Sequence, residues 1–263
     1  NQNKNNTIKA NNIYNFTSIG IFVTANGNGG EWVITKNSIY DLQSPAATSL
    51  QRGISFVAGY LSFGNYITEN FIGGQGPQCS GLPWNNEGSN DVYGIYFKGG
   101  WASNYINNNT IKNIHLSSGL AGSFYGLVVQ ECQSYVTGNT IGDPDVYNSI
   151  RSATANGSLE GIRIQAPSST CNVDGNRIYN LALTAYSGYP DATGIFSDNA
   201  HVHNNLMYGV GYCLQSPITP YIVGIYLNTS AGYLNEVFNN SVSLDGGFAA
   251  DPSIYGIYEY GSW

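Results

Sequence analysis

Two short sequence motifs alternate along the chain, and this alternation limits the fold more than any other feature. The first motif, apolar-x-x-Asn-x-apolar, is clearest at 106–111, and the second, Gly-apolar-x-apolar, follows it at 126–129. The asparagine of the first motif recurs at Asn37, Asn70, Asn109, Asn139, Asn176, Asn205 and Asn240. The glycine of the second recurs at Gly20, Gly53, Gly94, Gly126, Gly161, Gly194, Gly224 and Gly256. The average glycine spacing of about 34 residues lies in the range of solenoid repeats, so we expect one stacked coil per repeat.

Each repeat carries the signals of β-strands. Its apolar runs are three to five residues long, as in Ile95-Tyr96-Phe97, and β-branched and aromatic residues dominate them. Because the motifs return in the same sense, stacked copies place parallel strands about 4.8 Å apart. We therefore predict an all-β fold, a right-handed parallel β-helix solenoid of about eight coils that forms a single domain over 1–263. The residue after each repeat glycine should point inward: Ile21, Ile54, Ile95, Leu127, Ile162, Ile195, Ile225 and Ile257.

The recurring asparagines predict a structural ladder at one corner of the solenoid. Each lies between two inward apolar residues, where the chain has to bend sharply, and asparagine tolerates the left-handed backbone region better than most residues. Side-chain amides stacked in successive coils can donate and accept hydrogen bonds along the column. Asn109, Asn139 and Asn176 should therefore lie one above the other.

The spacing between motifs is uneven, which predicts loop insertions of different lengths. We expect insertions at 73–92, 142–158, 182–192 and 209–221, all rich in glycine, proline, serine or asparagine. The chain opens at a degenerate copy (Asn6-Thr7-Ile8) and closes within a repeat at 256–260, with no capping helix. These ends predict a segment of a longer chain, or a molecule that stacks end to end with another copy. Glu259 argues against this, because an acid in an otherwise apolar column would mark the end of the core.

Composition excludes several classes of function. Only 10% of residues are charged and the net charge is −7, with nine lysines and arginines in all, so no basic surface for nucleic acid is expected. No apolar run is long enough for a membrane-spanning helix, and no signal peptide is recognisable. The cysteines at 79, 132, 171 and 213 match no zinc spacing. They could form two disulfides in a secreted protein or remain buried free thiols, and the sequence does not choose between these.

The alternation of the asparagine and Gly-Ile motifs resembles the right-handed parallel β-helix proteins of the pectin-lyase-like superfamily. The phrase Tyr-Gly-Ile-Tyr, at 93–96 and 255–258, resembles large secreted repeat proteins of Bacteroidota-type bacteria. The resemblance covers nearly the whole chain and implies an extracellular or cell-surface protein. It implies little about activity, because this fold carries lyases, hydrolases, phage spikes and adhesins.

Known catalytic patterns of that superfamily are missing from the sequence. The nearest match to its Arg-Ile-Lys motif is Arg163-Ile164-Gln165, without the accompanying Asp-Asp and Gly-His-Gly motifs. The column four residues after each glycine contains one acid, Asp198, whereas calcium requires several oxygen ligands. We interpret Asp143 and Asp145 as turn-capping residues. The sequence therefore predicts no catalytic residues, no metal and no cofactor.

His201 and His203 should point outward on one strand. Both imidazoles could bind a metal, but no column of acids or cysteines accompanies them in the sequence. We interpret them as a solvated pair.

An aromatic column is the strongest candidate for a binding surface. Phe196, Tyr226 and Tyr258 occupy the outward position two residues after the glycine on three successive coils, and Tyr96 lies in the same column. An exposed aromatic strip suits a sugar chain or a protein partner, whereas a ladder covered by a loop would be structural. We therefore expect a non-enzymatic adhesive or structural module that forms fibres or binds glycans. A polysaccharide-active enzyme is the alternative.

Overall fold

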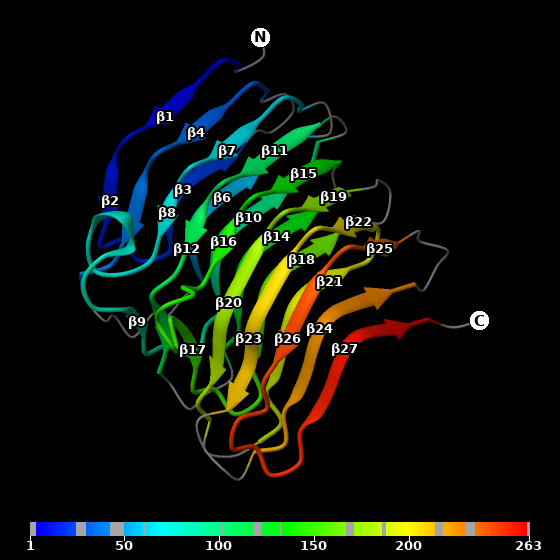
Figure 1. Ribbon diagram of the computed structural model, residues 1–263. Coiled ribbons are helices and arrows are strands. Elements are labelled where there is room, and N and C mark those ends of the chain that lie inside the picture. The colour runs from blue at the N-terminus through cyan, green and yellow to red at the C-terminus, as the bar shows by residue number, and fades with distance from the viewer. Residues whose placement is uncertain are drawn as a thin grey trace.

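The computed structural model describes residues 4–24, 30–42, 50–59, 62–100, 103–117, 122–131, 133–166, 171–185, 188–213, 218–229 and 235–261. Within these ranges the chain is a parallel β-helix, with strands of three sheets in each coil and one short 3-10 turn, η1 (Pro77–Cys79). The colours in Figure 1 pass in order from blue to red along the stack, so successive coils lie side by side. The predicted all-β parallel β-helix is confirmed. Among the described residues, no helix is long and apolar enough to cross a membrane.

Each sheet collects one part of every repeat. Sheet I contains β1 (Thr7–Lys9), β4 (Val33–Thr35), β7 (Tyr66–Thr68), β11 (Asn104–Asn107), β15 (Ser134–Thr137), β19 (Cys171–Asp174), β22 (Ala200–His203) and β25 (Glu236–Phe238). Sheet II contains β2 (Asn12–Tyr14), β5 (Ser38–Tyr40), β8 (Phe71–Ile72), β9 (Trp84–Asn86), β12 (Thr110–Ile111), β13 (Ile114–Leu116), β16 (Thr140–Ile141), β17 (Ile150–Ser152), β20 (Arg177–Leu183), β23 (Leu206–Cys213) and β26 (Ser241–Leu244). Sheet III contains β3 (Ile19–Thr24), β6 (Gln51–Val57), β10 (Val92–Lys98), β14 (Phe124–Gln130), β18 (Ser158–Gln165), β21 (Asp191–Ser197), β24 (Tyr221–Asn228) and β27 (Ser253–Tyr260).

The core is a set of aligned columns inside the three sheets. Ile95 of β10 pairs with Ile54 of β6 on one side and Leu127 of β14 on the other, and all three side chains are fully buried. The aromatic rings of Phe56 and Phe97 stack in the neighbouring column with centroids 5.0 Å apart. The inward column after the repeat glycines is buried as predicted, except at its last member. Ile257 pairs with Ile225 but is 57% exposed, because its coil is the last one described.

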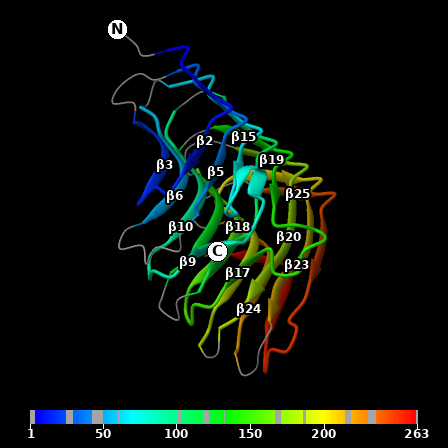
Figure 2. The same ribbon diagram turned by 90° about the vertical axis from the view of Figure 1, so that its left-hand side faces the viewer.

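The predicted count of about eight coils has to be corrected to about six turns. In the described part of the chain, sheets I and III each contain eight strands, of which the six inner ones have a neighbouring coil on both sides. In the outer layers the residues that should form the core are partly open, as in β1, β25 and β27. The turned view in Figure 2 shows the blue strands at one end of the stack and the red ones at the other.

The repeat glycines are required by the close approach of neighbouring coils. A Cβ on Gly161 would lie 2.6 Å from the carbonyl oxygen of Gly194 and 2.8 Å from Cδ1 of Ile178. Gly94 and Gly126 have similar surroundings, each facing the carbonyl oxygen of the next repeat glycine at 2.5 and 2.6 Å. None of these three has a positive φ, so the restriction is lack of space and not backbone strain.

Two of the predicted loop insertions contain strands of sheet II. The segment 73–92 includes β9, and 142–158 includes β17 and the first residue of β18. Trp84 of β9 is fully buried and lies in register with Ile114 of β13, which pairs in turn with Ile150 of β17. Likewise β20 and β23 extend into 182–192 and 209–221. A few apolar residues per segment are enough for these strands, because the neighbouring coil supplies the rest of the pairing.

Candidate ligand-binding surfaces

The recurring asparagines lie in one buried column between sheets I and II. From Asn37 to Asn205, each donates a hydrogen bond from Nδ2 to Oδ1 of the asparagine in the next coil over 2.9–3.0 Å, and Asn240 is the last acceptor. Nδ2 of Asn109, for example, also donates to the carbonyl oxygen of Ile67 in the preceding coil at 2.8 Å. Since Asn109 and Asn139 are fully buried, this column holds coils together and is not available to a ligand.

Two details of the ladder differ from the sequence-based expectation. The left-handed residue is the one before each ladder asparagine, for example Asn108 at φ 56° and Asn204 at φ 55°. The ladder also begins earlier, at Asn11, whose Nδ2 donates to Oδ1 of Asn37 at 3.0 Å. Asn11 belongs to the complete motif at 8–13, so the first copy is this one and not the degenerate one at 6–8.

The predicted aromatic column forms on the outer face of sheet III. The rings of Phe196 and Tyr226 stack with centroids 5.0 Å apart and planes 17° apart, and Tyr258 follows at 5.3 Å and 46°. The guanidinium of Arg163 lies 4.5 Å from the centroid of Phe196 and continues the column in the preceding coil. All of these side chains are half-buried. Because the rings face one another along the solenoid axis, they present edges to solvent rather than open faces.

Tyr96 occupies the same column but does not join that stack. Val128 and Arg163 occupy the two coils between Tyr96 and Phe196. The guanidinium of Arg52 instead lies over the ring of Tyr96, 3.8 Å from the ring centroid. Its hydroxyl donates to Oε1 of Gln130 at 2.7 Å. The structure thus brings together three of the four candidate aromatic residues.

A row of polar side chains runs beside the aromatic column. Nε2 of Gln130 donates to Oε1 of Gln165 at 2.6 Å, and Nδ2 of Asn228 donates to Oδ1 of Asp198 at 2.9 Å. Burial raises the pKa of Asp198, although the Asn228 hydrogen bond and the charge of Arg163 act in the opposite direction. Amide and carboxylate groups next to aromatic edges provide donors and acceptors for hydroxyl groups.

The outer face of sheet I carries a second aromatic column that the sequence analysis missed. Tyr66, Tyr105 and Tyr135 stack with centroids 4.8 and 5.2 Å apart and planes within 10° of parallel. Each lies four residues before a ladder asparagine, so the signal was present in the sequence. In the next two coils the same column contains Asn172 and His201.

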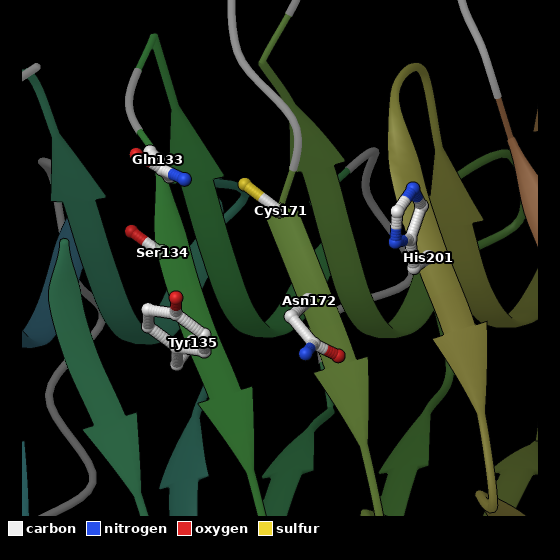
Figure 3. Close-up of a pocket in the computed structure, with 6 residues that line it drawn as sticks. All are labelled: Gln133, Ser134, Tyr135, Cys171, Asn172 and His201. Atoms are coloured by element: carbon white, nitrogen blue, oxygen red, sulfur yellow. The ribbon is translucent and has the colours of Figure 1, made fainter. Parts of the chain in front are cut away.

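The column opens into a cavity where the aromatic rings stop. The cavity has a volume of about 170 Å³ and is lined by Gln133, Ser134, Tyr135, Cys171, Asn172 and His201. Figure 3 shows Asn172 between Tyr135 and His201, which project outward from three neighbouring strands, while the buried Ser134 and Cys171 precede Tyr135 and Asn172 on their strands. Oδ1 of Asn172 is buried and accepts no hydrogen bond within the protein. A buried acceptor without a donor is costly, so a hydroxyl group that reaches it would form a hydrogen bond that the protein itself does not supply.

His201 and His203 project outward as predicted, but each has a carboxylate beside it. Nε2 of His201 lies 3.7 Å from Oε2 of Glu236, and Nδ1 of His203 lies 2.9 Å from Oδ1 of Asp174. The His203 ring also stacks on Phe238 with centroids 4.7 Å apart. These are single acids from neighbouring coils and do not form a column of acids along the strands. The part of the chain that the structure describes contains no group of three or more histidine, cysteine or acidic side chains placed to bind a metal.

The described cysteines are buried thiols. Cys79, Cys171 and Cys213 form no disulfide, and burial raises the pKa of each thiol to about 12. Cys132 lies outside the described residues. Since the thiolate is the reactive form, these three cysteines are poor nucleophiles at neutral pH.

A second cavity, of about 260 Å³, lies between the segments 73–92 and 142–158. Its charged groups are Lys112 and Asp143, whose Nζ and Oδ2 atoms are 2.7 Å apart. Burial alone would raise the pKa of Asp143, but the hydrogen bonds from Lys112 and from the Asp145 N–H lower it below its usual value. The Asp145 N–H donates to Oδ1 of Asp143 at 2.9 Å, the turn-capping role predicted from the sequence. The ion pair neutralises the cavity and leaves no free charge there for a ligand.

Acid sensitivity is expected from His115 of β13. Burial, aided by the charge of Arg151, lowers its pKa from 6.5 to about 4, so the folded protein keeps this imidazole neutral. As the pH falls from 6.5 towards 4 the unfolded chain binds a proton that the folded chain does not, and stability declines. After allowance for partial exposure, the loss is on the order of 2 kcal/mol. Urea unfolding at pH 7 and pH 4.5 should show a smaller difference for His115→Gln than for the wild type. An equal difference would assign the decline to other groups.

Comparison with known proteins returned no match: no protein-family model, no curated protein and no solved structure matches this chain. The function of the outer faces of sheets I and III is therefore inferred from their geometry alone.

Proposed function

We propose that the protein is a non-enzymatic, extracellular or cell-surface β-helix module that binds a glycan along the outer face of sheet III. The observation that carries this proposal is the half-buried column of Arg163, Phe196, Tyr226 and Tyr258 beside a row of amide and carboxylate groups. The extracellular setting rests on the resemblance of the repeats to secreted β-helix proteins.

The geometry suits a polymer better than a small molecule. The aromatic column and the polar row beside it form one strip on sheet III, which repeats once per coil, about every 4.8 Å. An extended β-1,4-linked glycan advances by about one coil height per sugar. Stacked rings offer edges and hydroxyl groups, so each coil contributes a weak contact and affinity has to build up over several coils. The low charge of the chain favours hydroxyl-rich partners over polyanions.

A polysaccharide-active enzyme is the second candidate, because carboxyl groups cluster on the same face. Burial and the charge of Glu160 raise the pKa of Asp191, and a carboxyl of raised pKa near a second carboxylate is the usual arrangement of a glycosidase acid and base. Glu160, however, is 4% exposed and its Oε2 accepts a hydrogen bond from Nε of Arg163 at 2.6 Å. A carboxylate so enclosed is poorly placed to reach a glycosidic bond, so binding is the better supported function.

The test is affinity electrophoresis through gels that contain a panel of neutral and acidic polysaccharides. At least one polysaccharide should retard the wild type, and Tyr226→Ala should weaken the retardation about 10-fold, equivalent to about 1.4 kcal/mol. Tyr14→Ala is the matched control, because Tyr14 is also an outward tyrosine in a stacked pair, with Tyr40 on sheet II at 5.3 Å.

Equal losses in the Tyr226 and Tyr14 variants, or no retardation by any polysaccharide, would reject the binding strip. An assay for reducing ends and unsaturated products on the same panel separates the two candidates. Turnover that disappears in Asp191→Asn would establish the enzyme instead.

A further inference from the structure

The tyrosine column on sheet I is interrupted by a gap one residue wide. Tyr135, Asn172 and His201 occupy the same outward position on β15, β19 and β22, so their backbones are one strand spacing apart. Tyr135 stacks on Tyr105 with one ring face, while its other face borders the cavity above the short side chain of Asn172. Two strand spacings separate the Tyr135 and His201 positions, which is about 9.5 Å.

We propose that this gap, the Tyr135–His201 slot, binds a single sugar ring between the Tyr135 and His201 side chains (Figure 3). The inference deepens the proposed glycan binding and rests on it for the class of ligand. The bound ring takes the place in the column that an aromatic side chain at position 172 would fill. Its two faces contact the tyrosine and the imidazole, and its hydroxyl groups reach the polar floor and rim.

The width of the slot fits one ring. Two strand spacings equal two steps of the tyrosine column, in which neighbouring ring centroids lie 4.8 and 5.2 Å apart, so one ring fits between the two walls. A pyranose fills this space more fully than a flat ring, because its ring carbons and axial hydrogens lie on both sides of the mean plane. The cavity volume of about 170 Å³ is below the range of pockets for drug-sized ligands, which fits one ring and not an oligomer.

The floor of the slot contains a hydrogen-bond acceptor that lacks a donor. Oδ1 of Asn172 is a buried acceptor with no donor in the protein, and a sugar hydroxyl can supply one. The exposed Gln133 at the rim and His201 on the opposite wall can bond to further hydroxyls. A simple aromatic hydrocarbon would leave Oδ1 of Asn172 without a partner.

The decisive variant fills the gap from within the chain. Asn172→Phe places a ring at the missing position of the column, so it should block the slot and also stabilise the stack by completing it. A higher melting temperature than the wild type would show that the variant is folded and that its ring occupies the gap. Val33→Tyr is the matched control, because it adds a ring to the same column next to Tyr66, away from the slot.

Binding is measured by saturation-transfer NMR with methyl β-D-glucopyranoside and methyl β-D-galactopyranoside, and with 4-methylphenol as a flat ring. We expect transfer to the ring protons of at least one glycoside with the wild type and with Val33→Tyr, and at least a 10-fold loss with Asn172→Phe. Asn172→Leu, which has the same branching but no acceptor, should weaken binding about 10-fold.

The slot is rejected if neither glycoside shows transfer, if Asn172→Phe binds as well as the wild type, or if 4-methylphenol is preferred over both sugars. These outcomes are independent of the strip on sheet III. If a polysaccharide retards the protein but neither glycoside binds, the strip on sheet III is supported and the slot is rejected. If a glycoside binds, Asn172→Phe abolishes this binding, and no polysaccharide retards the protein, the slot is supported and the strip is rejected.

Discussion

Replacing Gly161 by alanine should lower the free energy of unfolding by about 3 kcal/mol, near the upper end of the usual cost of overpacking. The added Cβ would lie 2.6 Å from the Gly194 carbonyl oxygen and 2.8 Å from Cδ1 of Ile178. The first of these atoms belongs to the backbone of the next coil, so it can move only if that coil moves. Guanidinium unfolding followed by circular dichroism would measure the loss.

Gly256→Ala provides the control within the same column. A Cβ on Gly256 has no atom within 4 Å, so this variant should unfold within about 0.5 kcal/mol of the wild type. The two substitutions are chemically identical and differ only in whether another coil is stacked against the glycine. Equal effects at both positions would show that the glycines serve some purpose other than close coil packing.

Replacing Asn139 by leucine should destabilise the fold by a similar amount, about 3 kcal/mol, because several buried polar groups lose their partners together. Oδ1 of Asn139 accepts hydrogen bonds from N and Nδ2 of Asn109, both at 3.0 Å, and its Nδ2 donates to the Ile106 carbonyl oxygen at 2.8 Å. Leucine has nearly the same shape but offers neither a donor nor an acceptor. Thermal melting of the purified variant would report the change.

Asn240→Leu tests whether position in the ladder matters. Asn240 is half-buried at the last described coil, and water can reach groups that the substitution exposes. Its cost should stay below about 1 kcal/mol, within the range of a single exposed hydrogen bond. A melting temperature for Asn139→Leu equal to that of Asn240→Leu would argue that the ladder contributes little to stability.

The fold could be predicted from the sequence because one register repeats many times. The motif around Asn109 places two apolar residues inward and one amide at the corner. Each further copy of the motif places its residues in the same way. Asn11 fits the motif as well as the later copies do, so the true start of the ladder could also be predicted from the sequence. The tyrosines four residues before the ladder asparagines were equally visible in the sequence.

Other features depend on contacts between coils, which no single repeat specifies. The partners of His201 and His203, Glu236 and Asp174, lie in neighbouring coils at distances in sequence of about 30 residues. The buried strand at Trp84 has the composition of a loop and pairs only because Ile114 continues its column. The space over Asn172 depends on how the Tyr135 and His201 side chains stand in the two neighbouring coils, which no single repeat specifies.

The asparagine ladder also makes the molecule electrically polar. From Asn11 to Asn205 each ladder amide donates from Nδ2 to the asparagine of the next coil, and from Asn37 to Asn240 each accepts at Oδ1 from the asparagine of the preceding coil. If each of the eight amides has a dipole like that of a peptide group, about 3.5 D, their sum approaches about 28 D along the axis. Its positive end lies at the C-terminal coil and its negative end at the N-terminal coil. Each further coil of this kind lengthens the dipole by one amide while leaving the net charge of the rod unchanged.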